Sequence, residues 1–214
     1  MVTQANLSAH PGANPQRWIV GMTGASGAVY GVTLCRQLLA LGFEVHLVIS
    51  DAGWRVLQTE LRWNAARRQE ALVSAFGGAV AEGRLVYHPL ADIGATIASG
   101  SFQCCGMVVI PCSMGTLSAI AHGTSHNLLT RAADVTLKEG RPLIVVPRET
   151  PLSAIHLENM LKLARLGARV IPAMPAFYHG PQTLDDMIRF MVGKVLDNMG
   201  IANNLYNRWG ESDG

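Results

Sequence analysis

The chain has 214 residues, of which 49% are hydrophobic and 15% are charged, and its formal net charge is +2. This length is enough for one α/β domain with a well-buried core. The near-neutral charge, without a basic block, argues against a nucleic-acid-binding protein, and no apolar run approaches the ~20 residues of a membrane-spanning helix. With a mean hydropathy of +0.23, the low charge content predicts that much surface is buried between subunits.

The cysteines and the amino terminus bear on the compartment. The amino terminus lacks the charged-then-apolar layout of a signal peptide. No pair of cysteines has CxxC spacing, so we expect buried, reduced thiols in a cytoplasmic protein. The cysteines are Cys35, Cys104, Cys105 and Cys112.

The first ordered segment combines a strand, a glycine turn and a helix. Trp18–Val20 is typical of a short buried strand, Gly21–Gly27 of a tight turn, and Val29–Leu41 has apolar residues at helical spacing. Such a turn lets backbone N–H groups approach an anion at the positive helix end, and Ser26 can add a hydroxyl. The spacing GxxGxxG matches neither GxGxxG nor the P-loop. A nucleotide-phosphate site is favoured, and a purely structural turn stays open.

A second strand is predicted at Phe43–Ile49, followed by Ser50 and Asp51. In a doubly wound sheet a ribose or flavin edge lies at this position. Asp51 would hold ribose hydroxyls in an NAD-binding protein. Equally, Ser50 or Asp51 caps the next helix, and both interpretations stay open.

The middle of the chain predicts helices at Asp51–Leu61 and Asn64–Phe76 and a short strand at Leu85–Tyr87. The loop Pro89–Phe102 is long and without structure of its own. Long ordered loops of this kind are more often functional than idle.

A second strand–turn–helix unit follows. The continuous apolar run Met107–Cys112 is typical of a central parallel strand covered on both faces. It ends in the turn Ser113–Thr116 and a helix of small residues to Ala121. Two such turns at the carboxyl edge of one sheet predict a ligand crevice.

The next strand ends in an adjacent pair of opposite charges. After a helix at Asn127–Lys138, the strand Pro142–Pro147 leads directly into Arg148 and Glu149. Charges at the end of a buried strand are costly unless they are bound to something. A salt-bridged scaffold and a ligand-facing pair both remain open.

The last elements are a helix at Ser153–Leu166, a short strand at Val170–Pro172, the loop Pro175–His179 and a helix that Thr183 caps. At least five strands alternate with helices, so we predict a single doubly wound, mainly parallel α/β domain.

We assign this domain to residues 17–202, with a flexible tail at 1–16 and a C-terminal tail at 203–214. Trp209 in the second tail packs on its own subunit or on a neighbouring chain, and the latter is favoured.

Four stretches together resemble one family. MTGASGAVYG, PCSMGTLSAIAHG, VPRETPLSAIHLENM and AFYH are similar to segments of the UbiX-type flavin prenyltransferases, and the likeness covers roughly Trp18 to Gly210. The third motif is long and specific. This family belongs to a wider Rossmann-like flavoprotein group that includes flavin-dependent cysteine decarboxylases. The resemblance therefore implies a Rossmann/flavodoxin-like three-layer fold.

The resemblance also implies an activity. Members join the dimethylallyl group of dimethylallyl (mono)phosphate to N5 and then C6 of reduced FMN, without a metal ion. The product, prenylated FMN, is the cofactor of UbiD-type decarboxylases. Members form homo-oligomers, typically dodecamers, which agrees with the low charge content.

Carried over by position, the resemblance assigns three groups of site residues. The FMN-binding residues would be Gly24, Ala25, Ser26, Ser50, Ser113, Met114, Gly115, Thr116 and Arg148. The donor phosphate would be bound by Tyr178 and Lys194, with Arg131, Lys138 and Arg148 as further candidates from the same or neighbouring subunits. The catalytic residues would be Ser26, Glu60, Lys138 and Glu149, the two acids handling protons.

These residue types suit the chemistry. Breaking the allylic C–O bond leaves a phosphate dianion that Lys, Arg and Tyr donors stabilise, and a carboxylate can accept the proton released at C6. Two positions depart from the family: many members have Trp where Ile93 stands, and Arg is frequent where Lys194 stands. Lys is a point charge and not a bidentate fork.

Three alternatives remain. A flavin-dependent decarboxylase of the phosphopantothenoylcysteine type would need a PxMNxxMW motif, and the sequence here continues PCSMGTLS. An NAD-binding protein is opposed by the missing GxGxxG. A non-catalytic FMN-binding protein is opposed by the joint presence of the charged and phenolic residues Glu60, Lys138, Arg148, Glu149 and Tyr178.

Overall fold

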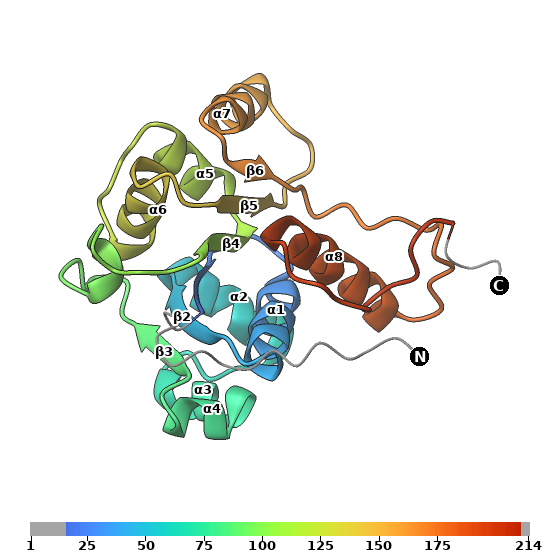
Figure 1. Cartoon of the computed structure of the whole chain (residues 1–214), viewed down its shortest axis with the longest axis horizontal. Helices are drawn as coiled ribbons and strands as arrows, with labels where there is room; N and C mark the ends of the chain where they lie inside the picture. The colour runs from blue at the N-terminus through green and yellow to red at the C-terminus, as the bar shows by residue number, and fades with distance from the viewer. Residues whose placement is uncertain (1–15, 211–214) are drawn as a thin grey trace, which may run out of the picture.

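The computed structural model describes residues 16–210, so the predicted flexible tail at 1–16 lies outside the described residues apart from Gln16. Within this range six strands form one parallel sheet in the order β3-β2-β1-β4-β5-β6 (Figure 1). The strands are β1 Arg17–Met22, β2 Glu44–Ile49, β3 Leu85–His88, β4 Gly106–Cys112, β5 Leu143–Pro147 and β6 Arg169–Val170. The predicted doubly wound α/β fold is confirmed.

Helices cover both faces of the sheet. One face carries α1 Ala28–Ala40, α2 Asp51–Leu61, α3 Arg68–Phe76, α4 Gly78–Ala81 and α8 Leu184–Met199. The other face carries the 3-10 turn η1 Thr96–Ala98 and the helices α5 Met114–Ala121, α6 Leu128–Lys138 and α7 Ala154–Arg165. Among the described residues, no helix is both long and apolar enough to cross a bilayer.

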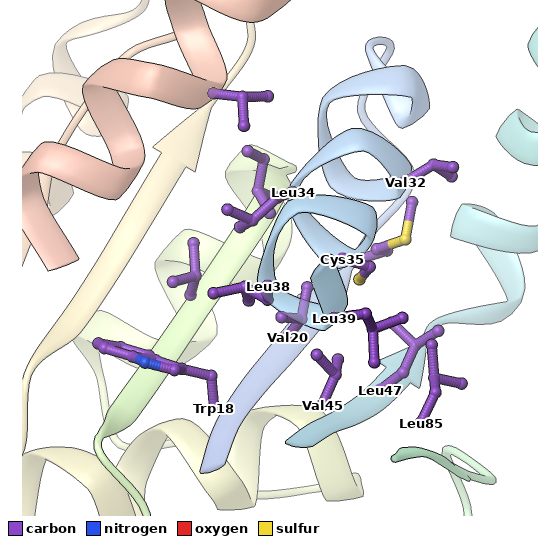
Figure 2. Close-up of a cluster of buried hydrophobic side chains, with 14 of the residues drawn as sticks. Trp18, Val20, Val32, Leu34, Cys35, Leu38, Leu39, Val45, Leu47 and Leu85 are labelled. Carbon is purple, nitrogen blue, oxygen red and sulfur yellow. The ribbon is translucent and has the colours of Figure 1, made fainter. Parts of the chain in front are cut away.

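Burial on both faces explains the continuous apolar strands. In β1, Trp18 and Val20 belong to the cluster under α1, whereas Ile19 belongs to the cluster on the other face. Figure 2 shows Leu34 and Leu38 of α1 among the side chains of this first cluster. Side chains alternate between faces along a strand, so both sets of positions in a doubly covered strand are mostly apolar.

The cysteines are all free thiols, as predicted. Burial raises the pKa of Cys35 and of Cys112 to about 12, so both stay protonated. Cys104 and Cys105 are only half-buried, which corrects the expectation that all are buried.

Several element boundaries differ from the predictions. Helix α3 begins at Arg68 and not at Asn64, because the side-chain oxygen of Asn64 accepts the N–H of Ala66 and forms a local turn. The short helix α4 lies between α3 and β3, where the sequence predicts no element. The long loop Pro89–Phe102 is not without structure, since it contains η1.

Candidate functional site

The turns that follow β1 and β4 are joined at the point where the strand order changes direction. Thr23, which is 2% exposed, follows β1. Its hydroxyl donates to the carbonyl of Pro111 at 2.8 Å and accepts the N–H of Ser113 at 2.7 Å. Ligands of doubly wound proteins bind in the crevice at this reversal. The Thr23 N–H also donates to the Pro111 carbonyl at 3.1 Å, so the hydroxyl and backbone of this one buried residue join the two predicted ligand turns.

The first turn needs glycine for two different reasons. A Cβ on Gly24 would lie 2.5 Å from the Cβ of Ala52, so Gly24 permits close packing on the start of α2. Gly27 has φ 103°, a left-handed conformation that favours glycine. Between them Ala25 is buried, and Ser26 is exposed at the crevice edge.

The N-terminus of α1 holds an anion supplied by the chain itself. The carboxylate of Glu60 accepts the N–H of Gly27 at 3.1 Å and that of Ala28 at 2.9 Å. The sequence predicted these N–H groups for a ligand phosphate, whereas here a carboxylate takes the positive end of the helix dipole. Glu60 is thus placed beside Ser26 at the crevice edge.

Two serines of the predicted FMN site cap helices. The Ser50 hydroxyl accepts the N–H of Gly53 at 2.9 Å and caps α2. The Ser113 hydroxyl accepts the N–H of Thr116 and donates to its hydroxyl at 3.1 Å. The capping interpretation of Ser50 is therefore confirmed, while its contact with a flavin stays a prediction. Asp51, considered for a ribose, pairs with Arg68 at 2.8 Å.

The second turn is open on its outer side. A Cβ on Gly115 would meet no atom within 4 Å. Met114 beside it is buried, whereas Thr116 is partly exposed. The open glycine and the partly exposed hydroxyl fit a flat ligand laid along the turn.

Arg148 and Glu149 lie at the same edge, directly after β5. The Arg148 N–H donates to the carbonyl of Cys112 at 3.3 Å, so this segment borders the second turn. Both side chains are exposed and help to line a cavity of about 90 Å³ with Leu152 and Met160. Within residues 16–210 neither forms an ion pair, so the salt-bridged scaffold is wrong for this chain by itself.

Tyr30 on α1 links these charges. Burial raises the pKa of Tyr30, the positive charge of Arg148 lowers it, and the negative charge of Glu60 raises it. Arg148 and Glu60 therefore both lie within electrostatic range of one phenol. Charges of opposite sign therefore act on Tyr30 from residues 60 and 148.

Lys138 lies near the amino-terminal ends of the strands, opposite to the carboxyl ends that Arg148 and Glu149 follow. It is the last residue of α6, shortly before β5 begins, and it pairs with Glu139 at 2.6 Å. Arg148 follows β5, whose five residues span about 16 Å at roughly 3.3 Å each. Arg131, on the same helix, pairs with Asp134 at 3.0 Å. One chain does not bring Lys138 to Arg148.

Tyr178 and Lys194 belong to a third place. Lys194 is on α8, which covers the face opposite to α6. Figure 1 shows α8 beside α1, with the segments that flank α8 reaching away from the sheet. The ring of Tyr178 meets Phe190 at 5.7 Å and Trp209 at 5.5 Å.

Two functional candidates escaped the sequence reasoning. Thr23 joins both turns, but a threonine after a strand gives no signal of its long-range partner. Asp197 on α8 binds the side chains of Tyr206 and Arg208, so the described part of the C-terminal tail folds back on its own subunit. An acidic residue in an amphipathic helix pattern usually belongs to the solvent-facing side, so the sequence carries no sign of these partners. Contact of the tail with a neighbouring chain stays a prediction.

The site offers hydroxyls, backbone donors and single charges. Within the described range, no group of three or more His, Cys, Asp or Glu side chains is placed to hold a metal ion. Two parallel turns, exposed hydroxyls and an Arg at one edge fit a phosphate-bearing planar ligand.

Comparison with known proteins gives a consistent family. A model of the family described as Flavoprotein matches residues 8–196. The flavin prenyltransferase UbiX of Alkalihalophilus pseudofirmus is 55% identical over 192 residues, covering 90% of this chain and 95% of that protein.

Two crystal structures are similar over nearly their whole length. AnUbiX (PadA1) in complex with FMN and dimethylallyl pyrophosphate has a TM-score of 0.84 and 38% identity, covering 94% of this chain and 100% of that chain. The dodecameric FMN-dependent Ubix-like decarboxylase of Escherichia coli O157:H7 has a TM-score of 0.81 and 45% identity, covering 91% and 99%. The chain therefore belongs to the Flavoprotein family and, within it, to the UbiX-type flavin prenyltransferases.

Proposed function

We propose that the chain transfers a dimethylallyl group from dimethylallyl phosphate to N5 and then C6 of reduced FMN, making prenylated FMN. One observation carries this proposal beyond family membership. The two crevice turns are joined through Thr23, and beside them Arg148 and Glu149 are exposed without an ion pair in the described chain. Charges left open beside a phosphate-type cradle are suited to an anionic substrate and a proton transfer.

FMN fits the turns as its binding site. Gly24, Ala25 and Ser26 would border its phosphate region, Ser50 would meet it at the end of β2, and Ser113 to Thr116 would lie along the ring. Arg148 would reach it from the end of β5. Reduced FMN supplies an electron-rich ring as the acceptor of the prenyl carbon.

The chain's own groups stabilise the departing phosphate and move the proton. Cationic and phenolic donors aimed at the phosphate stabilise the charge that develops as the C–O bond breaks; these are Arg131, Lys138, Arg148, Tyr178 and Lys194. The carboxylate of Glu149 accepts the proton that C6 releases. Glu149 accepts only the N–H of Thr150 in the described chain, at 3.0 Å, whereas Glu60 already binds two N–H groups.

We infer that these donors converge only between subunits. In one chain Lys138 ends α6, Arg148 follows β5, and Tyr178 packs on Phe190 of α8, so the three lie at separate places. A homo-oligomer, for which we propose a dodecamer like that of the Escherichia coli relative, can bring three chains to one site. Exposed apolar side chains on and near α7 offer a surface for such contacts, among them Ile155 at 67% and Leu157 at 52% exposure.

The product leaves for a second protein. Prenylated FMN is of use only to an enzyme that binds it, and we propose a UbiD-type decarboxylase as the recipient.

The test is anaerobic incubation of the protein with reduced FMN and dimethylallyl monophosphate, followed by mass analysis of the released flavin. We expect a gain of one C5 unit. Omission of the protein and omission of the donor are the controls. Bound FMN without a mass gain would contradict the proposal and favour a decarboxylase or a non-catalytic FMN-binding protein.

A further inference from the structure

One carboxylate on α8 fastens the described end of the chain. Asp197 Oδ2 accepts the Tyr206 hydroxyl at 2.6 Å and Arg208 Nη1 at 3.1 Å. Its Oδ1 accepts Arg208 Nη2 at 2.7 Å and the Asn203 side-chain amide at 2.9 Å. Bidentate, charge-assisted bonds of this kind are short and directional. Three side chains of residues 203–208 are thus tied to a single point of the helix.

A glycine inside α8 receives the fastened tail. Gly193 is buried in the middle of the helix, where glycine costs about 1 kcal/mol relative to alanine. A Cβ there would lie 2.6 Å from the Tyr206 ring and 3.0 Å from the Asn203 side-chain oxygen. The absence of a side chain lets the Tyr206 ring pack directly on the backbone of α8.

The fastened tail leads to Tyr178 through a series of rings. Tyr206 meets Phe190 at 5.0 Å, and Phe190 meets Tyr178 at 5.7 Å. On another side, Trp209 stands edge-on to Tyr178 at 5.5 Å and 81°. Trp209 is 80% exposed, so burial does not fix its ring, and its place depends on the anchored Arg208 beside it.

We propose that Asp197 is a positioning residue for the prenyl-donor site: by fastening Tyr206 and Arg208 to α8, it places Trp209 against Tyr178 and fixes the direction of the Tyr178 hydroxyl. This inference rests on the proposed function, which gives Tyr178 the donor phosphate. Asp197 acts through the tail and takes no part in the transfer. Pre-ordering a binding side chain lowers the entropy lost when the donor binds.

The Asp197 carboxyl group is ionised at neutral pH. Burial alone would raise the pKa of Asp197, but the hydrogen bonds and charge from Arg208 and the Tyr206 hydroxyl hold it below its usual value. Burial and the bond to Asp197 raise the pKa of Tyr206 to about 12. Through neutral pH, Asp197 therefore remains the acceptor and Tyr206 the donor.

The test compares the variants D197N and Y206F with wild type as FMN-loaded holoenzymes. Because a loosened Tyr178 binds the donor phosphate less well, we expect D197N to raise KM for dimethylallyl monophosphate about tenfold, with kcat and the FMN dissociation constant within about twofold of wild type. Y206F keeps the Arg208 pair and should give a smaller rise. D185N, the same change in the first turn of α8, is the matched control and should leave KM unchanged.

A second measurement reads the tail itself. Trypsin cleaves after Arg208 only if the guanidinium leaves Asp197, so cleavage there should be faster in D197N than in wild type and D185N. A released tail with an unchanged donor KM would overturn the positioning role, and so would a tail cleaved no faster in D197N. Failure of the proposed function is distinguishable, because wild type itself would then form no prenylated flavin while the trypsin result would stand.

Discussion

His46 on β2 and His88 at the end of β3 form a buried pair, with Nδ1 of the first 2.8 Å from Nε2 of the second. Burial lowers the pKa of His88 to about 4, helped by the charge of His46. Burial also lowers the pKa of His46, although Glu44 opposes the shift. Both rings are therefore neutral in the folded protein at neutral pH.

This pair predicts a pH dependence of stability. The unfolded chain takes up protons on these rings below about pH 6.5, whereas folded His88 does so only near pH 4. The contribution of this pair to the free energy of unfolding should be complete above pH 6.5 and should fall as the pH drops towards 4. Denaturant titrations of wild type and H88Q should show a shallower fall for the variant in this window. H122Q, which changes an exposed histidine, is the control, and equal slopes for all three would contradict the assignment.

We propose Glu149 as the residue that accepts the proton in prenyl transfer. E149Q keeps the shape of the side chain but removes its basicity, so we expect prenyl transfer to fall by about 10²–10⁴-fold with unchanged FMN affinity. Single-turnover formation of prenylated FMN and FMN titration measure the two effects. E158Q on the exposed side of α7 is the control. Turnover of E149Q at the wild-type rate would remove the assigned role.

Thr23 acts at the level of elements, since it joins the turns after β1 and β4. T23V removes the hydroxyl at nearly constant volume and leaves the partly buried N–H of Ser113 without its acceptor. We expect a loss of about 1–3 kcal/mol in the free energy of unfolding and weaker FMN binding. T59V, which removes an exposed hydroxyl bound to a carbonyl of its own helix, should change both little. FMN affinity equal to that of wild type would show that the turns are held in place without Thr23.

The sequence predicted the elements with strong local signals. Two local signals predicted β1, β4 and the turns that follow them: the glycine turn after Trp18–Val20 and the apolar run at Met107–Cys112. Such signals depend only on neighbouring residues, so they can be recognised in the sequence. The predicted start of α3 was wrong, because the Asn64 side chain accepts the N–H of Ala66 and forms a turn before the helix. The bond of Glu60 to the N-terminus of α1 and the bond of Asp197 to Tyr206 could not be predicted. Each joins segments whose approach depends on the folded structure.

At the scale of the whole molecule, helix α7 exposes apolar side chains. Helix α7 buries only Asn159 and Leu163, while Leu157 and Leu161 are 52% and 50% exposed. If α7 lies between subunits, the double change L157E/L161E buries charge at an interface and should dissociate the assembly. Native mass spectrometry should then show smaller species, and prenyl transfer should be lost. K162E on the same helix is the control, and an intact assembly of the double variant would place the interface elsewhere.

We propose that prenyl transfer takes place in a site shared by several copies of the chain. The direct measurement is formation of prenylated FMN by mixed oligomers of S26A, altered at the crevice edge, and K138M, altered at the opposite edge of the sheet. Each variant alone should be nearly inactive, whereas co-expression in equal amounts should restore about a quarter of wild-type activity, because a quarter of randomly assembled sites hold two intact contributions. Mixed oligomers as inactive as the single variants would contradict the shared site, and inactive wild type would contradict the transfer itself.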